Sequence, residues 1–252
     1  MARDFDGNGD KINFGNVTPK TSGISIAGWV NLNNVEDVSN DHRIFASVSI
    51  STSDSTVNST VNIGDWTAAN DTRIQFGYKD GGWTEHFSDS EISITGWQNV
   101  VVTYDGSNVR FYLNGVADGA PAETGSLPTS GTYDFQVGTR SNSGTSVDFD
   151  GFIAEVAYWE RVLTAGEAAG LGKGFSPEFY PKDLRVYTHI FGRESPEPSL
   201  VGASGTIGGT PSYVDHPRII IPSSKQIRWF SAVAAAELVQ DVLQPGIIPF
   251  AR

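Results

Sequence analysis

Residues 97–114 read WQNVVVTYDGSNVRFYLN, and this stretch decides the fold class. Two runs rich in β-branched and aromatic residues flank an Asp-Gly pair at 105–106, which is typical of a hairpin turn with positive φ angles. In the second run, Val109, Phe111 and Leu113 occupy alternate positions and therefore share one face of a strand. The stretch predicts an antiparallel β-hairpin with one face against a core.

Short segments of the same kind occur on both sides of this hairpin. Strands are expected at 24–32, 43–50, 73–78 and 151–159, each bounded by residues that favour turns. After the last of them, Thr164 and Glu167 have the spacing of a capping box, which predicts the start of a short helix. We therefore expect an all-β fold with two antiparallel sheets, closed by that helix.

The chain changes character after residue 171. Residues 1–172 are expected to form the sandwich, and residues 173–231 hold most of the prolines and lack sustained alternation. That composition predicts an extended arm or a small irregular subdomain. Residues 232–252 are expected to form a third part, a helix followed by a C-terminal tail. The stretch AVAAAELVQDVL at 232–243 favours a helix that ends before Pro245.

Composition excludes several classes of function. The formal net charge of −12 disfavours binding to nucleic acid and to anionic membranes. The absence of cysteine excludes disulfides and thiolate metal sites. The first residues, MARDFDGNGD, carry charges where a signal peptide needs an apolar stretch, and no apolar run has the length of a membrane helix. We therefore expect synthesis in a cytoplasm and no membrane insertion.

Two acidic clusters offer candidate ligands for a structural calcium ion. The first has the D-x-D-x-N-G pattern of half an EF-hand loop, but its twelfth position is Gly15 and not a bidentate Glu. The second cluster opens the strand at 151–159. The candidate ligands are Asp4, Asp6, Asn8, Asp10, Asp148 and Asp150. The alternative is that these residues simply form turns. No other cofactor is expected.

Aromatic residues are candidates for ligand binding, because exposed rings stack on sugars and anchor protein interfaces. The candidates are Trp66, Tyr78 and Trp83, of which Trp83, between glycines and polar residues, is expected to be exposed. The alternative is that such rings belong to the core. The four histidines show no metal-ligand spacing and are expected to be surface or turn residues, with His216 ordering the proline-rich stretch through hydrogen bonds.

Four segments resemble laminin-G-like domains of the concanavalin A-like jelly roll. They are FDGNGD at 5–10, ISIAGWV at 24–30, the hairpin at 97–116, and FDGFIAEVAYWERVLTAGEAAGL at 149–171. The resemblance covers residues 1–172 and implies a jelly-roll sandwich. Glucanases of this fold carry two carboxylates with an Asp between them. Here that Asp is missing, and regular alternation puts Glu155 and Glu160 on opposite faces. We therefore expect a binding protein and no enzyme, with hydrolysis as a remote alternative.

A second resemblance concerns residues 180–224, which are similar to a segment that follows laminin-G-like domains in virion proteins of tailed bacteriophages. It implies a virion structural protein, foremost a capsid decoration protein on the particle surface. The implied partners are the major capsid protein or other virion proteins, contacted by several copies of this chain. The alternative is a carbohydrate-binding adhesin or receptor-binding tail component that recognises host glycans.

Overall fold

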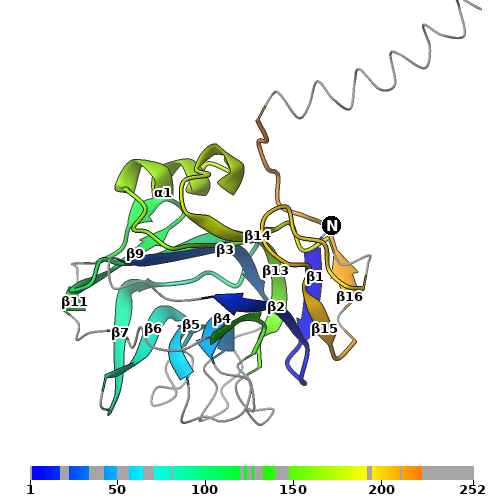
Figure 1. Ribbon diagram of the computed structural model, residues 1–252, viewed down its shortest axis with the longest axis horizontal. Coiled ribbons are helices and arrows are strands. Elements are labelled where there is room, and N and C mark those ends of the chain that lie inside the picture. The colour runs from blue at the N-terminus through cyan, green and yellow to red at the C-terminus, as the bar shows by residue number, and fades with distance from the viewer. Residues whose placement is uncertain are drawn as a thin grey trace, which may run out of the picture.

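The computed structural model is a two-sheet antiparallel sandwich, as the sequence predicts (Figure 1). It describes residues 2–17, 23–33, 43–49, 57–64, 71–80, 82–119, 122–123, 127, 133–139, 148–191, 195–210 and 212–222. The strands expected at 24–32, 43–50, 73–78 and 151–159 are confirmed, with ends that differ by up to two residues. The helix predicted at 232–243 lies outside the described residues.

The first sheet has nine strands and contains the hairpin that decides the fold class. Its main path runs through β10 (Val116–Ala117), β9 (Asn108–Leu113), β8 (Gln98–Tyr104), β3 (Ile24–Leu32), β13 (Asp150–Trp159), β1 (Ala2–Asp6) and β16 (Ser212–Val214). Beside this path, β11 (Ala122–Glu123) pairs with β9, and β14 (Leu184–Thr188) pairs with β13.

The second sheet has seven strands and packs face to face with the first. Its order is β15 (Thr206–Gly208), β2 (Lys11–Val17), β12 (Tyr133–Val137), β4 (Arg43–Ser49), β5 (Val57–Ile63), β6 (Arg73–Asp80) and β7 (Gly82–Glu91). Large side chains from both sheets fill the space between them, among them Phe5, Phe45 and Tyr158, all fully buried. Each such side chain contributes about 1.5–3 kcal/mol relative to an exposed position.

One short helix follows the last long strand. Helix α1 (Ala165–Gly172) begins with the predicted capping box, since Thr164 accepts a hydrogen bond from the Glu167 amide and Glu167 accepts one from the Thr164 amide. The helix covers the outer face of the first sheet, where Leu171 packs in a cluster with Trp159. Within the described residues, neither α1 nor the 3₁₀-turn η3 (Pro177–Phe179) has the length and hydropathy needed to cross a membrane.

The described part of the proline-rich stretch, residues 173–222, corrects the sequence-based expectation. These residues form neither an extended arm nor a separate subdomain, because β14 pairs with β13, β15 with β2 and β16 with β1. Figure 1 shows these strands in yellow and orange at the edges of both sheets. The strands are at most five residues long, too short to show alternation, and prolines flank them at edges where a missing N–H is tolerated.

Candidate functional site

Of the predicted ligand-binding aromatic residues, Trp83 lies on the surface of the second sheet. Its side chain is 40% exposed, and its indole Nε1–H donates to Oε1 of Glu85 at 2.6 Å. The indole covers Gly77 on the neighbouring strand, where a Cβ atom would collide with the ring. The absence of a side chain at Gly77 therefore makes room for the ring to lie against the sheet.

The other two candidates have different outcomes. Tyr78 follows Gly77 on β6, so its side chain points to the opposite face, where it is 1% exposed and stacks on Phe76 with 5.9 Å between ring centroids. The prediction of a ligand-binding role for Tyr78 is therefore wrong, because the ring belongs to the core. Trp66 lies outside the described residues.

A row of polar side chains crosses the second sheet on the face that carries Trp83. The register pairs Gln136 with Ser47, Ser47 with Thr60, Thr60 with Gly77 and Asn62 with Gln75, and directly paired residues share a face. We call this set the polar sheet face: Ser47, Thr60, Asn62, Gln75 and Gln136. All of its members are buried, so it is a polar layer and not a hydrated surface.

Several groups on the polar sheet face have no hydrogen-bond partner among the described residues. Asn62 donates to Gln75, which leaves Oδ1 of Asn62 and Nε2 of Gln75 free. The hydroxyl of Thr60 and Oε1 of Gln136 are also unsatisfied. A buried polar group without a partner costs about 1–3 kcal/mol, so such a group is expected where water or a ligand completes the bonding. The sequence did not predict this set, because polar residues at alternate strand positions usually face solvent.

The acidic clusters meet in space, because strands β1 and β13 are neighbours in the first sheet. Asp6 on β1 pairs with Asp150 on β13, and the Gly9 amide donates to Oδ2 of Asp148 at 2.8 Å. The Thr210 amide donates to Oδ1 of Asp10 at 2.7 Å. Burial raises the pKa of Asp10 although this amide opposes the shift.

The remaining carboxylates of these clusters also bind donors within the chain. Asp6 accepts from the Asn8 amide, Asp150 from Asn33, and Asp4 from the hydroxyl of Ser212. Hydrogen bonds of this kind are what the alternative of turn-forming residues predicts. A calcium ion at these carboxylates stays a prediction, which calorimetry with Ca²⁺ after exhaustive chelation would test.

A second group of chemically active residues surrounds Glu155. A bulge in β13 shifts the register between Ala154 and Ala157 and gives Glu155 a φ of 56°. The Glu155 side chain is therefore turned inward and is 2% exposed. Regular alternation does not predict this orientation, since it is the bulge that places the carboxylate among polar groups of the C-terminal part.

Three side chains hold that carboxylate. The hydroxyl of Tyr187 donates to Oε2 at 2.5 Å, while Nδ1 of His189 lies 2.5 Å and Nε2 of His216 3.1 Å from Oε1. Burial raises the pKa of Glu155, but the hydrogen bonds from His189 and His216 outweigh burial and lower it. Because His216 also lies 3.2 Å from the carbonyl oxygen of His189, the prediction that it orders this part of the chain is confirmed.

Glu155, His189 and His216 line a cavity of about 410 Å³, which we call the histidine cleft. Its other lining residues are Glu178, Phe191, Leu200, Ile219 and Ile221. Phe191 is 41% exposed and stacks on His189 with ring centroids 4.5 Å apart. The sequence did not predict this cleft, because Glu155, His189 and His216 are 34 and 27 positions apart and meet only through strand pairing.

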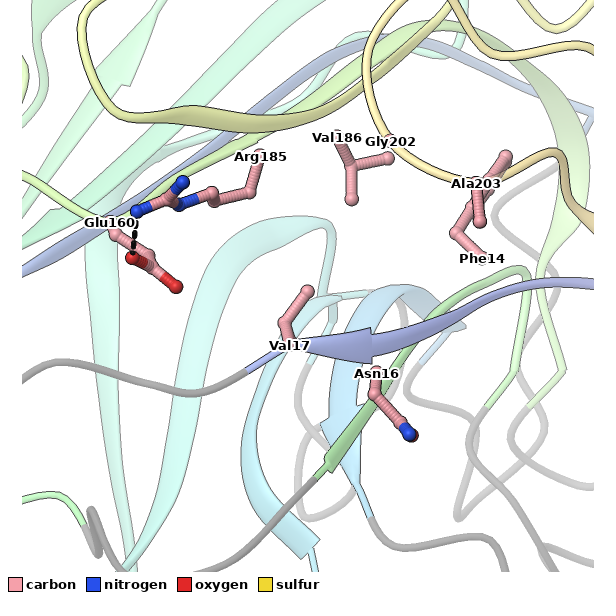
Figure 2. A pocket seen from close by; sticks show the side chains of 8 residues that line it. All are labelled: Phe14, Asn16, Val17, Glu160, Arg185, Val186, Gly202 and Ala203. Atoms are coloured by element: carbon pink, nitrogen blue, oxygen red, sulfur yellow. Dashed lines mark ion pairs between the residues drawn. The ribbon is translucent and has the colours of Figure 1, made fainter.

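A second cavity, of about 310 Å³, opens between the two sheets (Figure 2). Phe14, Asn16 and Val17 of β2 form one wall, and Glu160 and Arg185 form an ion pair of 2.8 Å on the other. Glu160 and Glu155 therefore line different cavities. Their separation agrees with the expectation that these carboxylates do not face each other as a hydrolytic pair.

The fold is similar to several solved structures. One is a Bacteroides ovatus protein named for carbohydrate binding, with 19% identity, a TM-score of 0.62, and coverage of 88% of this chain but 61% of that chain. Another is domain 4 of the extracellular arabinanase AbnA from Geobacillus stearothermophilus in complex with arabinotriose, with 18% identity, a TM-score of 0.52, and coverage of 68% and 76%.

A third is the SAP-like pentraxin of Limulus polyphemus, with 13% identity, a TM-score of 0.54, and coverage of 82% and 94%. A comparison with curated proteins gives no match. Residues 6–169 match the Laminin_G_3 family model, described as the concanavalin A-like lectin/glucanases superfamily. With that match over most of its length and the sandwich described above, the chain belongs to the concanavalin A-like lectin/glucanase superfamily.

Proposed function

We propose that this chain is a carbohydrate-binding, lectin-like domain that acts by binding and not by catalysis. The observation that carries the proposal is the exposed indole of Trp83, which lies against Gly77 beside the polar sheet face. An exposed aromatic ring stacks on the apolar face of a sugar. The hydrogen bond to Glu85 fixes the indole in advance, which lowers the entropy cost of binding.

The structural neighbours support the same proposal. The Bacteroides ovatus protein is named for carbohydrate binding, and the arabinanase domain is in complex with arabinotriose. A glycan array probed with the full chain tests the proposal. We expect hits that Trp83→Ala loses and that Trp97→Ala, the same substitution directly before β8 of the other sheet, retains. An array without hits, repeated with Ca²⁺ present, would contradict the proposal.

The absence of catalysis is part of the proposal. It is supported by Glu155 and Glu160, which line separate cavities, and by Glu155 being enclosed by Tyr187, His189 and His216. Retaining and inverting glycosidases both need two carboxyl groups that flank the same glycosidic bond. Incubation of the chain with β-glucans should give no product. Hydrolysis that disappears in Glu155→Gln would instead establish an enzyme.

We further propose that the domain is displayed on the surface of a phage particle, foremost as a capsid decoration protein. The support is the similarity of residues 180–224 to a segment of phage virion proteins. Because residues 173–222 are built into the sandwich, we assign attachment to the major capsid protein or another virion protein to residues 223–252. Quantitative mass spectrometry of purified particles tests this: many copies indicate the capsid, few copies a receptor-binding tail component, and none would contradict it.

A further inference from the structure

We propose that Glu155, His189 and His216 form a binding site for one divalent transition-metal ion of the zinc type, independent of the carbohydrate site. One ligand atom from each of these side chains lies within 4.8 Å of the other two, which is the spacing that a single ion requires. Among the described residues, no other group of three histidine and acidic side chains has its ligand atoms this close together. Two imidazoles and one carboxylate are a ligand set that proteins use for zinc.

The hydrogen bonds of His216 show why an ion fits here. Its Nδ1 lies 2.7 Å from the carbonyl oxygen of Pro217, and its Nε2 lies 3.1 Å from Oε1 of Glu155 and 3.2 Å from the carbonyl oxygen of His189. All three partners are hydrogen-bond acceptors, whereas a neutral imidazole carries one N–H. When Nδ1–H donates to Pro217, the lone pair of Nε2 faces two oxygen atoms, and these atoms repel one another. A cation between Nε2 and the two oxygen atoms would turn this repulsion into attraction.

The competing explanation is a doubly protonated His216 that forms an ion pair with Glu155. Both explanations place a positive charge next to the buried carboxylate. The two explanations predict different roles for His189. A metal ion would also bind to Nδ1 of His189, whereas the ion pair between His216 and Glu155 needs only a hydrogen bond from the His189 ring. The contribution of His189 to metal affinity therefore separates them.

Neighbouring side chains orient the carboxylate as metal sites require. The Tyr187 hydroxyl donates to Oε2 of Glu155, and the Ser176 hydroxyl donates to Tyr187 at 3.0 Å. Oε1 is left facing both histidines. Such outer partners hold the ligands in place and typically contribute a factor of about 10–100 to metal affinity. Tyr187 is thus a positioning residue of the site.

An ion can reach these ligands from solvent. The histidine cleft opens onto the three side chains, and both histidines are partly exposed while Glu155 forms the floor. Three protein ligands also leave a fourth position of a tetrahedral ion open toward the cleft.

A metal ion bound at this site would stabilise the C-terminal part of the fold. Glu155 belongs to β13, His189 follows β14, and His216 follows β16, so one ion would join three segments. A ligand that binds only the folded state stabilises it by mass action. We therefore expect saturating Zn²⁺ to raise the melting temperature of the chain.

Isothermal titration of the tag-free, chelated full chain with Zn²⁺ tests the proposal. We expect one ion per chain, an affinity lowered more than about 100-fold in His189→Ala and His216→Ala, and lowered about 10–100-fold in Tyr187→Phe. Glu178→Gln is the matched control, because it removes a carboxylate from the same cleft without removing a ligand, and its affinity should stay within about tenfold of the wild type. Binding of Co²⁺ should add the visible absorption of a four-coordinate site with nitrogen ligands.

Three results would overturn the proposal. They are a wild-type chain that gives neither heat nor a higher melting temperature with Zn²⁺, histidine variants that bind as tightly as the wild type, and a Co²⁺ spectrum identical to that of the hydrated ion. Circular dichroism establishes that each variant is folded. Should an alanine variant fail that check, His189→Gln and His216→Gln keep the side-chain size, and the Co²⁺ spectrum of the wild type decides without any variant.

Discussion

Arg3 and Glu197 form a buried ion pair, with Nε of Arg3 2.7 Å from Oε2 of Glu197, although 194 positions separate them in the sequence. Their side chains are 4% and 1% exposed. Glu197 also accepts a hydrogen bond from the Phe191 amide through Oε1. The pair therefore ties the first strand, β1, to the C-terminal segment and makes that segment part of the sandwich.

Removal of this pair is expected to be costly. Glu197→Ala leaves the guanidinium of Arg3 buried without its carboxylate, and breaking a buried pair in this way costs about 3–5 kcal/mol. Urea denaturation measures the loss in the free energy of unfolding. Arg110→Ala, which breaks a partly exposed pair with Asp105, should cost less, about 1 kcal/mol. Equal losses in the two variants would contradict a structural role for the Arg3–Glu197 pair.

Two truncations separate the sandwich from the proposed attachment segment. A chain that ends at Pro222 keeps every described strand and should melt within a few degrees of the full chain, while no longer binding particles. A chain that ends at Leu171 loses β14, β15 and β16 and uncovers Glu155, so it should not give a cooperative melting transition. Differential scanning calorimetry and co-sedimentation with particles measure the two properties. If the chain without residues 223–252 still binds particles, the assignment of attachment to that segment is wrong.

Gly77→Ala tests the role of the surface below Trp83. The new methyl group would meet the indole and push it off the sheet, so the affinity for a glycan found on the array should fall nearly as far as in Trp83→Ala. A loss of about 1 kcal/mol or less in the free energy of unfolding is expected, because the ring is exposed. Gly82→Ala is the control, since a Cβ there meets no atom within 4 Å. Unchanged glycan affinity in Gly77→Ala would contradict the assigned surface.

The β8–β9 hairpin should respond to acid. Burial raises the pKa of Asp105, but hydrogen bonds from Arg110 and from the amides of Asn108 and Ser107 outweigh it and lower the pKa to about 2. A group with a lowered pKa stabilises the fold above its unfolded value of 3.8, and that contribution is lost as the pH falls towards 2. Asp105→Asn should therefore be less stable than the wild type at neutral pH, and most of this difference should be lost as the pH falls through about 2. A stability difference that does not change with pH would contradict the shift.

Local patterns were sufficient for most of the fold. The hairpin at 97–114, the capping box at Thr164 and the strand at 151–159 depend on residues close in sequence, and the structure has all three. The same alternation could have placed Tyr78 correctly, because Ile74, Phe76 and Tyr78 occupy one face of β6 and all are buried. The exposed Trp83 was predicted from its polar and glycine-rich surroundings.

The remaining features depend on contacts that no local pattern contains. The positive φ of Glu155 arises from a bulge in β13. Its histidine partners follow the short strands β14 and β16, which show no visible alternation. Prolines suggested a detached arm, whereas edge strands accept them because one side of each strand forms no ladder. The unsatisfied groups of the polar sheet face became visible only when the register placed Asn62 opposite Gln75.

The most direct test of carbohydrate binding beside Trp83 is a two-dimensional ¹⁵N–¹H spectrum of the full chain. The chain contains 6 tryptophans, and Trp83→Phe identifies which indole N–H signal belongs to Trp83. Addition of the strongest glycan from the array should shift the signal of Trp83 by more than that of any other tryptophan, because the sugar stacks on that ring. An unmoved Trp83 signal while the glycan binds elsewhere would contradict the account.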